Sequence, residues 1–422
     1  MSIILTFFAL FFLISLSVPV GLCIGGATIM AIVLFSDLQL SVIAQYSITG
    51  LDSFSMLAIP MFILAGTIMS VGGIAERLID VAAILFGHIV GGLGAIVAMS
   101  SMFFGAISGS SLATVSAIGS IMVPQMVKKG YGLGYSAVFT ACAGTIGAVI
   151  PPSIPLVIYG VVTGTSIGDL FLAGIVPGIL IGIGLIIGNY FTCKKRGYVQ
   201  KNERVNAKEA IKCIWDAKWA LFAPIVILGG IYAGIFTPTE AAVVAVVYSV
   251  IVSVFLYKEM TLKNVFEAIE TTAVVNGTTS YLLGISSAFA AYLSMEKIPT
   301  MITEALISVT DNKIIFLLLI NILLLIIGTV IDNIPATIII APMLLPTLAA
   351  FGIDPVHFGI IMTVNLLIGL VTPPYGCSLF VASAVCNVKF ETLVKNMFAP
   401  FLVLIISLIL ITYIPALSLM LL

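Results

Sequence analysis

The chain has 422 residues, of which 61% are hydrophobic and only 8% are charged. Soluble domains carry roughly 25% charged residues, so this composition excludes an ordinary soluble protein and indicates an integral membrane protein. The formal net charge of -1, without a basic block carrying interleaved aromatic residues, gives no support for nucleic-acid binding. The six cysteines show no CxxC spacing, which argues against a metal or disulfide framework.

Continuous apolar segments recur along the chain, and many reach the roughly 20 residues that a helix needs to cross a bilayer core. Since these segments do not alternate in polarity, the sequence predicts an all-α polytopic membrane protein rather than a β-barrel. We expect ten crossings and two re-entrant helical hairpins. In chain order these are two short spans within 1–35, a span at 51–72, a hairpin at 91–130, a broken helix at 132–165, spans at 170–192, 220–237, 240–257 and 272–292, a hairpin at 314–350, a broken helix at 357–388, and a span at 397–421.

The one long polar stretch runs from Cys193 to Trp219 and holds eight of the seventeen basic residues. Short loops rich in Lys and Arg stay in the cytoplasm, so we expect 193–219 to be a cytoplasmic linker with a short interfacial helix. This linker divides the chain into a first repeat, 1–192, and a second repeat, 220–422. Following the crossings away from it places both chain termini in the periplasm.

The two halves share a Gly and Pro pattern at an offset of 222 residues. The matched pairs are Pro124 and Pro346, Gly130 and Gly352, Gly147 and Gly369, Pro151 and Pro373, and Pro152 and Pro374. The loop after the first hairpin carries Lys128 and Lys129, whereas the matching loop "AFGIDP" carries no basic residue. The positive-inside bias therefore predicts that the two repeats have inverted topology.

Asp332 is isolated in apolar sequence, because residues 314–331 and 333–353 carry no charged side chain. An intramembrane carboxylate costs about 3 kcal/mol on insertion scales, so we expect it to face the protein interior or a polar cavity. It either caps the following helix or contributes to a cation site, and the two roles are compatible. At the repeat offset of 222 residues, Asp332-Asn333 matches Ser110-Ser111. The small residues at this second position either allow close helix packing or form part of a binding site.

Each hairpin tip and each Pro-Pro break leaves backbone N–H and C=O groups outside a helix. At membrane depth such backbone is tolerated only where it is buried in protein or lines a polar cavity. Half-helix N termini suit an anionic group, while carbonyl, hydroxyl and carboxylate oxygens suit a hard cation such as Na⁺. Inverted repeats with discontinuous helices are typical of secondary transporters, so the sequence predicts transport.

Four polar residues outside the hairpins are expected to have structural roles. Thr237 and Glu240 in "FTPTEAA" are typical of a helix start with a capping acid. His88 and His357 lie near predicted segment ends, so we expect both at the membrane interface.

Four segments carry a resemblance to a known family: "GAISGSSLATVSAIGSIMVPQMVKKGY", "GTIGAVIPPSIPLVIYG", "GIFTPTEAA" and "GLVTPPYGCSLFVASA". The chain resembles, over essentially its whole length, the large membrane subunit of tripartite ATP-independent periplasmic transporters. That resemblance implies an elevator-type ion-transporter fold in a bacterial inner membrane. It also implies Na⁺-driven uptake of a small organic acid such as a C4-dicarboxylate, a keto acid or sialic acid.

The resemblance further implies two protein partners, a small four-helix membrane subunit and a periplasmic substrate-binding protein. Because the chain begins directly with a segment like the large subunit, we expect the small subunit to be a separate polypeptide. Na⁺ is the one cofactor implied, and no catalytic residue is expected.

Carried over residue by residue, the resemblance implies two Na⁺ sites with substrate between them. The first Na⁺ site would comprise Ser108, Ser110, Ser111, Gly147, Ile150 and Pro151. The second would comprise Gly328, Asp332, Asn333, Gly369, Thr372 and Pro373. The substrate would contact Ser110, Ser111, Thr114, Pro152, Asn333, Thr337 and Pro374.

Three alternative functions have less support in the sequence. A stand-alone divalent-anion/Na⁺ symporter shares the hairpin plan and differs by needing no binding protein. An intramembrane aspartyl protease needs two facing aspartates, and only Asp332 lies deep in an apolar segment. A passive channel is disfavoured because the sequence has no repeated pore motif. We therefore expect a transporter and not an enzyme.

Overall fold

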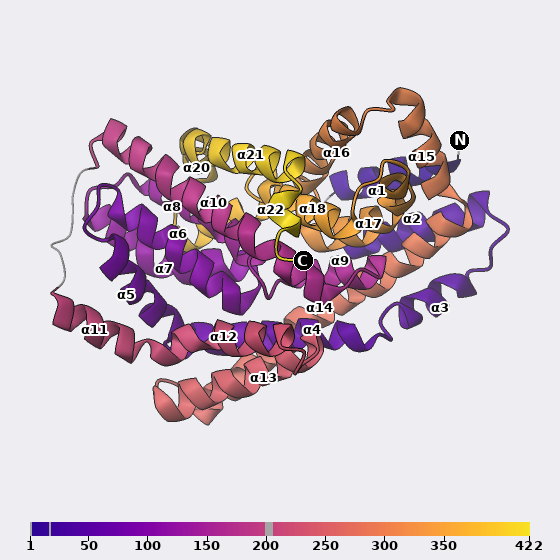
Figure 1. The fold of residues 1–422 in the computed structure, drawn as a ribbon. Helices are drawn as coiled ribbons and strands as arrows, with labels where there is room; N and C mark the ends of the chain where they lie inside the picture. Colours follow the sequence, from indigo (N-terminus) through magenta and orange to yellow (C-terminus); the bar gives the residue numbers. More distant parts are fainter. Residues whose placement is uncertain (1, 17, 199–205) are drawn as a thin grey trace.

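The computed structural model describes residues 2–16, 18–198 and 206–422, and these residues form helices and loops without a strand (Figure 1). Up to residue 196 the helices are α1 Ser2–Ser15, α2 Val20–Phe35, α3 Ser41–Thr49, η1 Phe54–Leu57, α4 Ala58–Val71, α5 Ile74–Phe86, α6 Gly92–Ser108, α7 Ser111–Lys128, α8 Leu133–Gly144, η2 Thr145–Ala148, α9 Ile154–Thr163 and α10 Ile167–Arg196. The later helices are α11 Ala207–Asp216, α12 Lys218–Tyr232, α13 Pro238–Val250, η3 Ile251–Leu256, α14 Leu262–Met295, α15 Ile298–Val309, α16 Lys313–Gly328, α17 Asn333–Ala350, α18 Pro355–Gly369, α19 Cys377–Cys386, α20 Phe390–Asn396, α21 Phe398–Tyr413 and α22 Ala416–Leu419. The predicted all-α class is confirmed.

The first predicted hairpin is the pair α6 and α7, which is followed by a helix broken into α8, η2 and α9. The chain turns between α6 and α7 at Gly109, whose φ of 62° is left-handed and suits glycine. Ser110 then caps α7 by accepting a hydrogen bond from the N–H of Ala113 at 3.4 Å. Ser153 does the same for α9, accepting from the N–H of Leu156 at 3.3 Å. Short polar side chains therefore begin both helices.

The second hairpin is the pair α16 and α17, and the second broken helix is α18 and α19. Asp332 caps α17 by accepting a hydrogen bond from the N–H of Asn333 at 2.7 Å. Gly376, with a left-handed φ of 53°, begins α19 without a side-chain cap. The helix breaks thus fall where the sequence predicts them. The division into inverted repeats and the re-entrant placement in a membrane stay predictions.

The first arm of each hairpin touches the following broken helix through a pair of glycines. A Cβ added at Gly105 would lie 2.4 Å from the Cα of Gly147, and one added at Gly369 would lie 2.5 Å from the Cα of Gly328. Real Cβ atoms essentially never come within 3.0 Å of another atom, so neither contact leaves room for a methyl group. Small residues allow this close backbone approach in membrane bundles.

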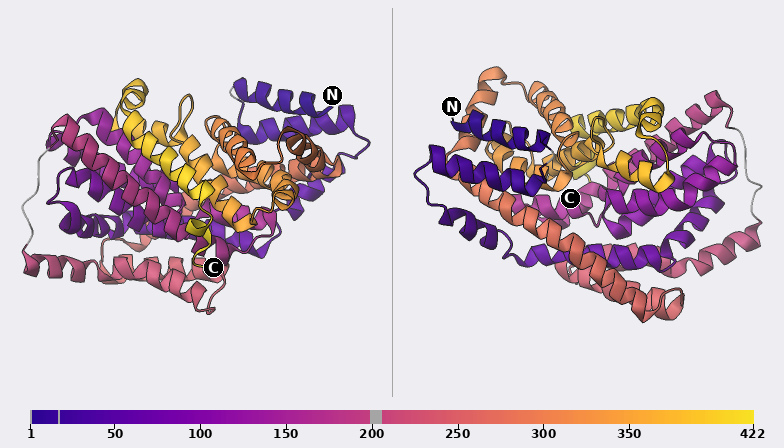
Figure 2. Two further views of the ribbon diagram at one scale, coloured as in Figure 1. Left: turned by 45° about the horizontal axis from the view of Figure 1, so that its top comes forward. Right: turned by 180° about the vertical axis from the view of Figure 1, so that it is seen from behind.

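Other helices surround these two units. Figure 1 shows α6, α7 and α8 toward one side of the molecule and α16, α17 and α18 toward the other. The 34-residue helix α14 packs against α2, α3 and α4, and Figure 2 shows it running along the back. Near the start of α13 the predicted capping is confirmed, because Thr237 and Glu240 form a reciprocal capping box.

By length and composition, four helices of the described chain can cross a membrane singly, or six if two bent pairs each count as one span. The four are 54–71, 167–196, 238–256 and 333–350. The other apolar helices have 10–17 residues, and they include arms of the hairpins and parts of the broken helices. Helix length alone does not reproduce the expected ten crossings, which stay a prediction.

The linker helix α11 and the histidine of α18 are two polar features outside the hairpins. In the linker, α11 forms within the expected 193–219 segment, while Lys201 and Arg204 lie outside the described residues. His357 is buried within the protein, at only 2% exposure, and its expected place at the membrane interface stays a prediction. The first turn of α18 packs against α21, and the carbonyl oxygen of Thr412 lies 3.3 Å from the His357 Nε2.

The close contact between Gly369 and Gly328 predicts how a substitution at Gly369 changes stability. Gly369→Ala should lower the free energy of unfolding by about 1–3 kcal/mol, because the added methyl group forces two backbones apart. Gly277→Ala is the matched control, since nothing lies within 4 Å of a Cβ at this helical glycine. Thermal unfolding in detergent measures both. Equal unfolding temperatures for Gly369→Ala and the unchanged protein would contradict the close contact.

Candidate functional site

The tips of the two hairpins line one shared cavity of about 70 Å³. Its wall contains Ser110 and Ser111 from the first tip and Asp332 and Asn333 from the second. The other lining residues are Gly109, Leu112, Ala148, Ile154, Pro155, Ile334 and Leu370. The fold therefore brings the two polar interruptions of the apolar sequence to the same space.

The first tip is held by hydroxyl groups that satisfy its own backbone. The Oγ1 of Thr114 donates to the carbonyl oxygen of Ser110 at 2.7 Å and lies 3.3 Å from the Oγ of Ser108. The N–H of Ile154 donates to the carbonyl oxygen of Gly109 at 3.2 Å, which joins the tip to the start of α9. These bonds fix the position of the tip relative to the first broken helix.

The second tip carries Asp332, the one carboxylate among the described residues that line the cavity. Asp332 is half-buried, and its side chain accepts from the N–H of Asn333. Among the described residues it forms no ion pair. Thr337, one turn into α17, is 1% exposed, and its Oγ1 has no hydrogen-bond partner in the described part of the chain. Asp332 is thus a helix cap that still has oxygen lone pairs available toward the cavity.

Three helices begin at this cavity. Ser111, Ile154 and Asn333 are the first residues of α7, α9 and α17, and each lines the wall. The N terminus of a helix carries unpaired N–H groups and about half a positive charge. Since no described Lys or Arg lines the cavity, these helix ends are its source of positive potential among the residues that the structure describes. The arrangement can bind an anionic group beside a cation held by oxygen atoms.

The structure brings only some of the predicted site residues to the cavity wall. Ser110, Ser111, Asp332 and Asn333 line it. The predicted residues that do not line it are Ser108, Thr114, Gly147, Ile150, Pro151, Pro152, Gly328, Thr337, Gly369, Thr372, Pro373 and Pro374. Of these, Gly147, Gly328 and Gly369 form the glycine contacts, and Thr372 donates its hydroxyl to the Ile368 carbonyl at 2.7 Å. Their role in Na⁺ or substrate binding stays a prediction.

Sequence reasoning missed Ser378, whose Oγ lies 3.2 Å from the Oγ of Ser111 and links the first tip to α19. The repeat gave no signal for it, because the position 222 residues earlier is Leu156. A hydroxyl residue directly after the second break was the available signal.

Sequence reasoning also missed a buried amide network beside the second hairpin. The Nδ2 of Asn365 donates to the Oδ1 and the carbonyl oxygen of Asn321 at 2.7 and 3.0 Å. The Nδ2 of Asn321 in turn donates to the Oγ1 of Thr412 at 3.0 Å. This network ties α16, α18 and α21 together. An asparagine within the apolar run "LLLINILLL" was the signal for it.

Comparison with known proteins identifies the family to which the chain belongs and known structures that share its fold. Residues 7–417 match the family model of the tripartite ATP-independent periplasmic transporter, DctM component. The chain is 44% identical to the isethionate transporter permease DctMQ of Oleidesulfovibrio alaskensis, over 97% of this chain and 64% of that longer protein. It is 38% identical to the sialic acid large permease SiaM of Vibrio cholerae, over 96% of this chain and 94% of that protein.

A solved structure with the same fold is the YdaH transporter of Alcanivorax borkumensis, with a TM-score of 0.65, 13% identity and 89% of each chain covered. At that identity the likeness establishes the fold alone. The family is established independently by the match over residues 7–417 and by full-length similarity to a large permease. The chain belongs to the DctM component family of tripartite ATP-independent periplasmic transporters.

Proposed function

We propose that this chain is the transport subunit of a Na⁺-coupled system that imports a small organic anion across a bacterial inner membrane. The observation that carries the proposal is the shared cavity, to which both hairpin tips contribute. The relatives named above transport isethionate and sialic acid, and both compounds are small organic anions. We therefore propose this substrate class without choosing one acid.

The lining of the cavity gives a reason for coupling to a cation. A substrate carboxylate or sulfonate beside the N termini of α7, α9 and α17 would also lie near the carboxylate of Asp332. Two negative charges about 4 Å apart repel by about 4 kcal/mol at an effective dielectric constant of about 20. Na⁺ bound at Asp332 would remove that repulsion, so cation binding would favour anion binding.

The volume of the cavity also argues for motion. Pockets that bind small organic molecules usually measure roughly 300–1,000 Å³, whereas this cavity holds about 70 Å³. That space suits an ion or a few water molecules but not a sugar acid. The hairpin tips must therefore separate to admit substrate, as alternating access requires.

The proposed system includes two partners, a small four-helix membrane subunit and a periplasmic binding protein that delivers the anion. Family membership supports both. Both relatives are named as transporter permeases, which supports transport in preference to intramembrane catalysis. The remaining alternative is a symporter of similar plan that takes its anion directly from solution.

Asp332→Asn tests the cation role. The amide keeps the size of the side chain and removes its charge, so the Na⁺ concentration for half-maximal uptake should rise at least about tenfold, equivalent to about 1.4 kcal/mol. The measurement is anion uptake into proteoliposomes across a series of Na⁺ concentrations. Asp311→Asn is the control, because Asp311 is exposed and lies outside the cavity. An unchanged Na⁺ dependence in Asp332→Asn would remove the carboxylate from the cation site.

Omitting the binding protein tests the partner assignment. Proteoliposomes that contain this chain and its small subunit should accumulate the anion only when the loaded binding protein is present outside and a Na⁺ gradient points inward. The control is the same vesicles without the gradient. Full uptake of free anion without the binding protein would instead favour the stand-alone symporter.

A further inference from the structure

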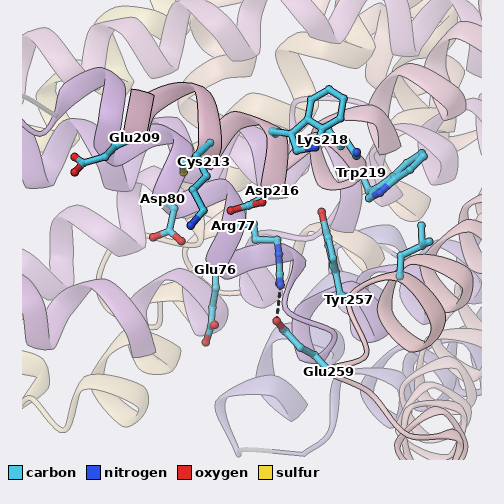
Figure 3. Close-up of a pocket in the computed structure, with 13 residues that line it drawn as sticks. Glu76, Arg77, Asp80, Glu209, Cys213, Asp216, Lys218, Trp219, Tyr257 and Glu259 are labelled. Carbon is cyan, nitrogen blue, oxygen red and sulfur yellow. Dashed lines mark hydrogen bonds and ion pairs between the residues drawn. The ribbon is translucent and has the colours of Figure 1, made fainter. Parts of the chain in front are cut away.

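A second, larger pocket lies away from the hairpin tips, between α5, α11, α12 and the segment 256–259 (Figure 3). Its volume is about 620 Å³, within the roughly 300–1,000 Å³ of small-ligand sites. Five carboxylates line it: Glu76, Asp80, Glu209, Asp216 and Glu259. Three cations line it as well: Arg77, Lys212 and Lys218.

Arg77 makes two hydrogen bonds and one aromatic ring contact within the protein. Its Nη2 lies 2.6 Å from the Oε1 of Glu259, and its Nη1 donates to the carbonyl oxygen of Gly73 at 2.8 Å. Its guanidinium also lies 3.7 Å from the centre of the Tyr257 ring. Figure 3 shows Arg77 and Glu259 facing each other at one side of the pocket. This pair is neutral together, so it leaves the other charges of the pocket uncompensated.

The four remaining carboxylates outnumber the two lysines. None of the four forms an ion pair with any described residue. Burial and the neighbouring Glu76 carboxylate raise the pKa of Asp80, while Arg77 lowers it. The Nζ of Lys218 lies over the ring of Trp215, at 3.7 Å from its centre. The pocket therefore offers acceptors for a cation beside two donors for an anion.

The two faces of helix α11 indicate whether this pocket lies in water or at the surface of a membrane. One face carries Ile211, Ile214 and Trp215, which are 68%, 45% and 66% exposed, and Trp215 also lines the pocket. Its opposite face carries Glu209, Lys212 and Asp216, which line the pocket. A surface helix of a soluble protein buries its apolar face, whereas the apolar face of α11 is exposed. An outward apolar face with Trp is typical of a helix that lies in the membrane interface.

The apolar outward stripe continues into α12 with Trp219 and Phe222, which are 37% and 47% exposed. Trp219 also lines the pocket. The charged pocket thus directly adjoins an aromatic surface suited to the boundary between lipid headgroups and acyl chains. A molecule that fits both surfaces has a charged head and an apolar tail.

We propose that this pocket binds the headgroup of a phospholipid that carries a primary ammonium and a phosphodiester, as phosphatidylethanolamine does. The ammonium would donate hydrogen bonds to Asp80 and Asp216, and the phosphate would accept from Lys212 and Lys218. A phosphatidylglycerol headgroup has no cation to offer the carboxylates. A phosphatidylcholine headgroup has a cation that cannot donate a hydrogen bond.

Native mass spectrometry of the detergent-purified full chain tests this inference, with the three lipids of identical acyl chains added in turn. Phosphatidylethanolamine should bind at least fivefold more tightly than the other two. In the double variant Asp80→Asn/Asp216→Asn that preference should be lost, and Lys212→Gln/Lys218→Gln should weaken phosphatidylethanolamine binding. Equal binding of the three lipids by the unchanged protein would overturn the proposal.

The matched control is Lys263→Gln/Glu267→Gln, which removes an exposed ion pair of α14 outside the pocket and should leave the preference intact. Thermal unfolding of each variant identifies loss of fold. If the carboxylate variant does not fold, single Asp80→Asn and Asp216→Asn variants take its place, and an undiminished preference in both overturns the proposal. Soluble phosphoethanolamine that competes as strongly as the lipid would assign the pocket to a soluble zwitterion and equally overturn it.

Discussion

Non-helical backbone inside a membrane must be buried or must line a polar cavity, and this constraint organises the whole molecule. The chain interrupts its apolar helices at two hairpin tips and two Pro-Pro breaks. The fold collects the freed groups of both tips and of the segments beside the breaks around one small space. Glycine contacts at Gly105 and Gly369 hold each hairpin against its broken helix, so each tip keeps its position relative to the broken helix of its own half. The cavity therefore forms where the chain brings together the free N–H and C=O groups of its non-helical backbone.

The same arrangement sets the electrostatics proposed for transport. Three helix N termini supply positive potential without a basic side chain, while Asp332 supplies one negative charge. In the proposed mechanism, an anion alone would meet both attraction and repulsion there, whereas an anion with Na⁺ would meet attraction only. Coupling between ion and substrate then needs no relay between distant sites, because both would occupy the same space.

Local structure was largely predictable from the sequence. The breaks and caps at Ser110 and Asp332 follow from residue chemistry within a few positions along the chain, and the structure has them there. Contacts between remote elements were not predictable in this way. Ser378 and Ser111 are 267 residues apart in the sequence, and Asn365 and Asn321 are 44 residues apart. Neither hydrogen-bonded contact therefore follows from a local sequence pattern. The burial of His357 was not predictable for the same reason, because it depends on packing of α18 against the remote helix α21.

Opposite orientation of the two repeats is the central claim, and cysteine accessibility tests it most directly. Lys128→Cys and Ala350→Cys place single thiols at exposed, repeat-related positions in a background without the six native cysteines. A membrane-impermeant maleimide applied to intact cells should label Ala350→Cys, and it should label Lys128→Cys only after the cytoplasmic side is opened. Labelling of both positions from the same side would contradict the inverted arrangement and the transport account built on it.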